Sequence, residues 1–123
     1  LGDVYKRQPY GQSKAALEAA TSSWAKEMVA TGVTANVLVP GGPTNTGFIP
    51  ASAPFDRAAL VQPEVMVAPI RWLASDASDE ETDSRFVGRD WDTSLAPDAA
   101  ALRASAPAAW PDIGTTAAWP GAS

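Results

Sequence analysis

The distribution of hydrophobic and polar positions predicts a helix near the start of the chain. Over residues 10–31, apolar and small side chains recur every three or four positions, which places them on one stripe of a helix. The stripe consists of Leu17, Thr21, Trp24 and Met28. Gly32 follows as a C-terminal stop, because glycine readily adopts the left-handed conformation that ends many helices. We expect the stripe to pack on a neighbouring element.

A strand is predicted directly after this helix. Residues 33–40, VTANVLVP, are rich in β-branched side chains and are apolar on both faces except at Asn36. Such a run is typical of a central strand of a parallel sheet, covered on both sides. Proline and glycine in residues 40–47, PGGPTNTG, prevent the strand from continuing.

The middle of the chain predicts a second helix and a second strand. Residues 63–75 begin with a proline at a favourable first helical position, while Pro69 is expected to kink or shorten the helix. The acidic stretch at residues 75–84 is interpreted as a solvated loop, and residues 85–92 are interpreted as a short strand. Helix, buried strand, helix and strand are typical of a parallel α/β sheet, here with too few strands to be complete.

The two ends of the chain are expected to lie outside this unit, which spans residues 10–92. Residues 1–9 fit no helical or strand period and resemble a translated adapter or a cloning scar; a loop or strand end of the parent protein is the alternative. Residues 93–123 are rich in alanine, proline and small polar residues, which predicts an extended or partly disordered tail. Trp110 and Trp119, each in an AAWP segment, are its candidate docking anchors.

Composition excludes several classes of function. Nine basic and 14 acidic residues give a net charge of −5, without the basic footprint of a nucleic-acid-binding protein. Since cysteine and histidine are both absent, thiolate or imidazole metal sites and histidine-dependent nucleophiles are excluded. The carboxylates of residues 79–83 lack the order of a calcium loop, so no metal site is expected. No apolar run approaches the roughly 18 residues of a membrane span.

Tyr10 and Lys14 are the candidate chemical groups. Four residues along a helix bring two side chains to nearly the same face. A nearby ammonium favours the phenolate form of a tyrosine, which makes the pair a candidate general acid/base for a hydroxyl or carbonyl. The alternative is an exposed tyrosine and a solvated lysine in the first turn of a helix.

The order of these stretches resembles the C-terminal half of the short-chain dehydrogenase/reductase family. The resemblance covers roughly residues 10–91. It rests on Tyr10-x-x-Ser13-Lys14 followed by Ala15-Ala16-Leu17, on Pro40-Gly41 closing a strand, and on Leu73-Ala74-Ser75-Asp76 and Gly88. It implies an incomplete doubly wound, Rossmann-type parallel sheet, and an enzyme that exchanges hydride between NAD or NADP and an alcohol/ketone pair.

The resemblance also implies roles for Tyr10 and Lys14. Tyr10 would exchange a proton with the substrate oxygen. Lys14 would support the phenolate form and bind the nicotinamide ribose. The apolar residues of the following loop, residues 47–60, favour an apolar wall for the substrate.

The turn after the first strand is implied to line the nicotinamide. Its cofactor-binding residues would be Pro40, Gly41 and Gly42, with Thr44 or Thr46 near the carboxamide and phosphate. The spacing of the family favours Thr46. A rigid turn that merely ends the strand is the alternative interpretation of PGGP.

Part of the family's machinery is absent from the sequence. No G-x-x-x-G-x-G occurs, and the serine that orients the substrate carbonyl would precede residue 1. We therefore expect either a piece of a cytoplasmic, homo-oligomeric oxidoreductase or a non-catalytic truncated chain. The truncated chain would at most associate through the helix that bears Trp24.

Overall fold

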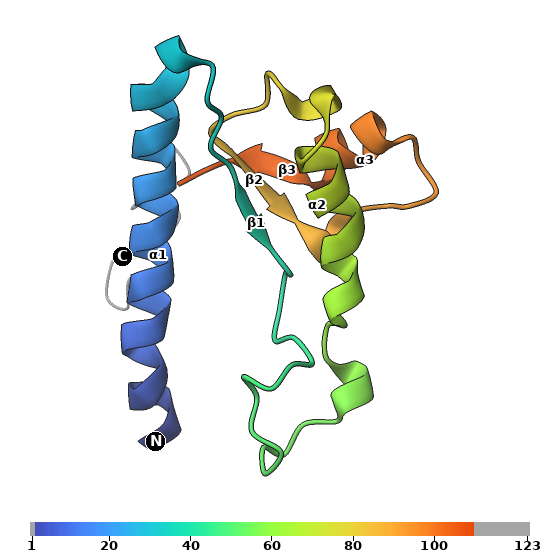
Figure 1. Ribbon diagram of the computed structural model, residues 1–123. Coiled ribbons are helices and arrows are strands. Elements are labelled where there is room, and N and C mark those ends of the chain that lie inside the picture. Colours follow the sequence, from blue (N-terminus) through green and yellow to red (C-terminus); the bar gives the residue numbers. More distant parts are fainter. Residues whose placement is uncertain (1, 110–123) are drawn as a thin grey trace, which may run out of the picture.

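The computed structural model describes residues 2–109 (Figure 1). It contains α1 (Gly2–Met28), β1 (Val37–Val39), α2 (Val67–Leu73), β2 (Ser84–Val87), α3 (Pro97–Ala104) and β3 (Ser105–Pro107). Short 3-10 helices occupy Val29–Thr31, Arg57–Ala59, Pro63–Met66, Asp76–Ser78 and Gly88–Asp90. The described part of the chain is therefore mixed α/β, as the sequence predicts at that level.

The sheet is small and mixed. Its strand order is β1-β2-β3, with β1 parallel to β2 and β2 antiparallel to β3. The predicted central strand, residues 33–40, is therefore an edge strand of three residues, and β2 occupies the centre. Asn36 explains the shortening, because its side-chain amide donates to the Glu81 carbonyl and its oxygen accepts the Ser84 amide. Residues just before β1 thus bond to a loop instead of extending the ladder.

Successive residues of β2 point to opposite faces of the sheet. Arg85 faces α1, where its guanidinium meets Glu18, whereas Phe86 lies in a hydrophobic cluster with residues of α2 and α3. This alternation is the normal consequence of strand geometry. Figure 1 shows α1 on one side of the sheet and α2 on the other.

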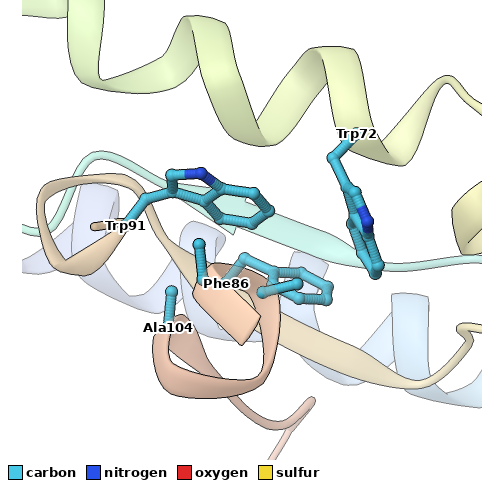
Figure 2. Packing of buried hydrophobic residues seen from close by; sticks show 6 residues of the cluster. Trp72, Phe86, Trp91 and Ala104 are labelled. Atoms are coloured by element: carbon cyan, nitrogen blue, oxygen red, sulfur yellow. The ribbon is translucent and has the colours of Figure 1, made fainter. Parts of the chain in front are cut away.

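The hydrophobic core is an aromatic cluster on the α2 and α3 side. Figure 2 shows Trp72 extending from α2 toward Phe86 of β2, with Trp91 beside them. The ring centroids of Trp72 lie 5.7 Å from Phe86 and 5.8 Å from Trp91. The indole N–H of Trp72 donates to the Asp98 carboxylate at 2.7 Å. Trp91 belongs to the core cluster as well.

The prediction of an extended tail is wrong for residues 97–104, which form α3, whereas residues 105–107 are extended as β3. Three alanines of α3 belong to the core cluster: Ala100, Ala101 and Ala104. Alanine has a strong helix propensity, and its small side chain lets α3 approach the aromatic rings closely. Trp110 and Trp119 lie outside the described residues.

The first helix begins earlier than predicted. It starts at Gly2 and runs through Pro9, so Tyr10 lies within the helix and not in its first turn. A proline removes only one hydrogen bond of the helical ladder, and helix propagation is cooperative, so the helix continues across it. The origin of residues 1–9 as a leader stays a prediction.

The predicted apolar stripe of α1 coincides only in part with its buried face. Leu17 and Trp24 remain 50% and 48% exposed, whereas Ser22 and Ala25 are buried. Polar contacts hold the helix in this orientation: Glu18 pairs with Arg85 at 3.1 Å, and Lys26 lies 3.5 Å from Asp83. Within the stripe, Leu17 and Trp24 therefore point away from the core, whereas Thr21 and Met28 are half-buried.

The second helix accommodates its internal proline. Residues 63–66 form a 3-10 turn and α2 begins at Val67, so Pro69 falls in the first turn of α2, where its missing N–H costs least. The expected shortening is confirmed. The acidic stretch is less solvated than predicted, because Ser78 is buried and its hydroxyl donates to the Leu73 carbonyl at 2.9 Å.

Candidate active-site groove

A groove of about 1000 Å³ lies between α1 and the loop that follows β1. Five of the seven residues predicted for the site line it: Tyr10, Pro40, Gly42, Thr44 and Thr46. Gly41 and Lys14 adjoin the groove without lining it. Segments separated by 30 residues in the sequence are thus brought to one cavity.

Tyr10 enters the groove from α1. Its ring lies 5.3 Å from that of Phe48 at an interplanar angle of 36°, which joins the helix to the loop. The ammonium of Lys14 lies 5.5 Å from the centroid of the Tyr10 ring. The two side chains are therefore neighbours on one face of the helix, as the spacing predicts, and the cation is placed over the ring.

The Pro40–Gly42 turn is fixed against the end of β2. The Arg89 amide donates to the Pro40 carbonyl at 3.1 Å. Gly41 has φ +99°, and a Cβ built on it would lie 2.6 Å from Cγ1 of Val87. Only glycine fits this conformation and this close approach. The turn is rigid, in agreement with the plainer interpretation of PGGP, and it also forms one rim of the groove.

The two candidate threonines differ in what their hydroxyls do. Thr44 donates its hydroxyl to the Gly42 carbonyl at 3.0 Å, so its proton stabilises the turn itself. Thr46 instead accepts the Phe48 amide at 3.4 Å. Within residues 9–109 this contact leaves the Thr46 proton free for a ligand, which agrees with the preference for Thr46.

The opposite wall of the groove is apolar. It contains Phe48, Ile49 and Phe55, which the sequence placed in the loop, together with Pro63 and Met66, which it did not assign to the site. No local signal marks Pro63 or Met66, because the 3-10 turn that carries them reaches the groove only through the tertiary fold. Among residues 9–109, no charged residue lines the groove.

The groove lies beyond the carboxyl end of β1, which is parallel to β2. In open α/β sheets, ligands bind in the crevice outside the carboxyl ends of parallel strands. The location of the groove relative to the sheet is therefore the usual one for a ligand site in this class of fold.

Comparisons with protein-family models, with curated proteins and with solved structures found no match to this chain. Within residues 2–109, no helix has both the length and the apolar character needed to cross a membrane.

Proposed function

We propose that the groove is the nicotinamide and substrate end of the active site of an NAD(P)-dependent oxidoreductase acting on alcohol/carbonyl pairs. The parent protein would contain a doubly wound, Rossmann-type sheet and act in the cytoplasm without nucleic-acid or membrane partners. The observation that carries the proposal is the meeting of Tyr10 with the Pro40–Gly42 turn in one groove. The chain also resembles the short-chain dehydrogenase/reductase family in these same residues.

The described residues fit the nicotinamide end of such a cofactor. The volume of the groove suits a ring and a small substrate, and an uncharged lining suits a neutral carboxamide. Thr46 has a hydroxyl proton available for the carboxamide or a phosphate. Lys14 lies beside Tyr10. From there its ammonium would donate a hydrogen bond to a hydroxyl of the nicotinamide ribose. When bound, the cofactor supplies the hydride acceptor or donor.

Tyr10 is the proposed acid/base. In oxidation its phenolate takes the proton from the alcohol oxygen while the carbon loses hydride, which yields the carbonyl. In reduction the phenol returns that proton to the oxygen. Lys14 would stabilise the phenolate by its positive charge. The apolar wall would exclude water from the reacting carbon.

Reduced nicotinamide mononucleotide tests the site, because it carries only the nicotinamide, ribose and phosphate that this groove would hold. We expect saturable binding by the 123-residue chain, measured by nicotinamide fluorescence. Lys14→Met should weaken binding about tenfold through the loss of a charge-assisted hydrogen bond. Lys26→Met, which removes a lysine far from the groove, should bind the mononucleotide as tightly as the unsubstituted chain does. No saturable binding would overturn the proposal.

Catalysis is tested by the turnover of an alcohol/ketone pair with NAD or NADP. Tyr10→Phe should reduce turnover by at least about a hundredfold, because only the transferable proton is lost. Binding of the reduced dinucleotide should be unchanged. An unaltered rate would refute the role of Tyr10 even if the nucleotide binds.

Self-association through α1 is a second candidate function. The half-exposed Leu17 and Trp24 form an apolar surface on α1, and Ala16 and Ala20 leave room for close approach of another helix. Under this proposal a second copy of the chain covers the apolar surface of α1. The function would then not require a ligand in the groove.

Sedimentation velocity over a concentration series tests the association. We expect a dimer that Trp24→Ser shifts to monomer. Val67→Ser, at a comparably exposed position on α2, is the matched control and should leave the dimer intact. A monomer at every concentration would exclude this function.

A further inference from the structure

The loop that forms the apolar wall of the groove is closed at its base by backbone pairing. Thr44 and Val61 form an isolated parallel bridge. The Asn45 amide donates to the Val61 carbonyl at 2.8 Å, and the Val61 amide donates to the Pro43 carbonyl at 2.9 Å. These contacts fix the two ends of the loop. Between them, short backbone turns bend the chain, such as the one closed by the Ile49 amide on the Thr46 carbonyl at 3.2 Å, and side chains connect these turns to one another.

Arg57 connects the turns on the groove side of the loop. Its Nη1 donates to the side-chain oxygen of Asn45 and to the Thr46 carbonyl, both at 3.1 Å. Its Nη2 donates to the Ile49 carbonyl at 2.7 Å. The two carbonyls stand on either side of Phe48 in the sequence. One planar guanidinium therefore holds the backbone on both sides of the residue that touches Tyr10.

Gln62 completes this network from the far end of the loop. Its amide nitrogen donates to the Arg57 carbonyl at 3.0 Å and to the Leu60 carbonyl at 2.9 Å. Its amide oxygen accepts from the side chain of Asn45 at 3.0 Å. Asn45 and Gln62 thus orient each other, and Asn45 presents its oxygen to Arg57.

All three hydrogen bonds from the Arg57 guanidinium go to uncharged carbonyl oxygens. Among the described side chains no carboxylate lies within ion-pair distance of Arg57, and the residue is half-buried. Hydrogen bonds from a guanidinium are stronger than neutral ones, and its planar fork fixes their directions. A lysine has the same charge but cannot reproduce three directed bonds from two nitrogens.

We propose that Arg57 is a positioning residue, which holds the Phe48 segment against the groove and thereby selects substrates with an apolar body. The proposal rests on the function proposed above, in which this groove receives the carbonyl substrate. It assigns Arg57 no contact with the reacting atoms. The guanidinium keeps the wall in its binding geometry before the ligand arrives, which lowers the ordering cost of binding.

Two measurements on the full chain test this role. The first is the affinity for 6-propionyl-2-(dimethylamino)naphthalene, an aromatic ketone whose emission shifts in apolar surroundings. We expect Arg57→Ala to lower this affinity about tenfold, since the wall would have to be ordered on binding, and Arg57→Lys to lower it less. Arg103→Ala, which removes an arginine paired with Asp92 away from the groove, should bind the ketone as the parent chain does.

The second measurement is hydrogen exchange, which needs no ligand. In Arg57→Ala we expect faster exchange at the amides of Asn45 and Val61 and unchanged exchange in β2, because Arg57 does not contact the aromatic core. Unchanged exchange and ketone affinity would overturn the proposal. An equal loss in Arg103→Ala would also do so. Full recovery in Arg57→Lys would show that charge alone suffices, which contradicts the role of the fork.

The outcomes separate this inference from the proposed function. If the mononucleotide fails to bind while Arg57→Ala loosens the loop and weakens ketone binding, the reductase proposal fails and the positioning role stands. If the mononucleotide binds and Arg57→Ala changes neither measurement, only the positioning role fails.

Discussion

The two sides of the sheet are held together by different physical means. On the α2 and α3 side, Phe86 is 1% exposed and packs against Trp72 and Trp91. On the α1 side, the Glu18–Arg85 and Lys26–Asp83 pairs connect the helix to the sheet, and Leu17 and Trp24 of α1 remain about half exposed. The first side is stabilised by hydrophobic burial, the second by a few directional contacts.

This difference bears on the groove, because the groove draws on both sides. Tyr10 comes from α1, whereas the Pro40–Gly42 turn is fixed to β2. The geometry of the groove therefore depends on how firmly α1 is attached to the sheet. Any partner that covers Leu17 and Trp24 would also hold Tyr10 in place.

The largest effect is expected in the aromatic core. Phe86→Ala should destabilise the chain by about 3–5 kcal/mol, because a fully buried ring leaves a cavity. Chemical denaturation followed by tryptophan fluorescence measures the loss. Phe48→Ala is the control. The Phe48 side chain is 74% exposed and contributes little to stability, so the denaturation midpoint of this variant should barely change. Equal losses in the two variants would contradict the assignment of the core.

The turn where the two regions meet should be the next most sensitive. Gly41→Ala is expected to cost about 2 kcal/mol or more, because a Cβ there would collide with a packed neighbour, at 2.6 Å from Val87. The control is Gly47→Ala, where a Cβ meets nothing within 4 Å. Denaturation midpoints compare the two, and a tolerated alanine at residue 41 would show that the turn is not rigid.

The attachment of α1 is tested through its half-buried ion pair. Glu18→Gln should cost about 1–2 kcal/mol, because it weakens charge-assisted hydrogen bonds, which Arg85 donates to Glu18 at 3.1 and 3.3 Å. Hydrogen exchange should accelerate in α1 and not in β2. Lys26→Gln removes a pair whose lysine is mostly exposed, so its effect should be smaller. Acceleration in both elements would show that the two sides unfold as one unit.

The smallest effect is a pH dependence near α3. Hydrogen bonds from the Ser94 hydroxyl and amide, together with the charge of Arg103, lower the pKa of Asp92 from its ordinary value of 3.8. A carboxyl whose pKa is lower in the folded state contributes stability above the unfolded pKa and loses it as pH falls through the folded one. Asp92→Asn should therefore lower stability at neutral pH, and this deficit should vanish in acid. A deficit independent of pH would contradict the assignment.

The order of elements was predictable because it depends on local chemistry. The helical period of residues 10–31, the proline–glycine turn and the helix that begins near Pro63 are all present. The neighbourhood of Tyr10 and Lys14 also follows from helix geometry alone. Such features depend on residues within a few positions of one another, so the sequence contains enough information to predict them.

The partners of each face were not predictable in the same way. The apolar stripe of α1 has the pattern of a buried face, yet α1 forms ion pairs with residues more than 50 positions away and leaves Leu17 and Trp24 about half exposed. The alanines of α3 have the composition of a tail, yet they are buried because aromatic rings of α2 and β2 lie against them.

The sequence by itself therefore determined the succession of helices and strands, the turn after β1, and the pairing of a phenol with an ammonium on one helical face. Only the tertiary structure decided which strand is central, which helical face is buried, and that Arg57 holds the loop opposite Tyr10. The physical reason is that backbone preferences and turn chemistry act over a few residues. Burial and charge pairing instead depend on which distant segments meet.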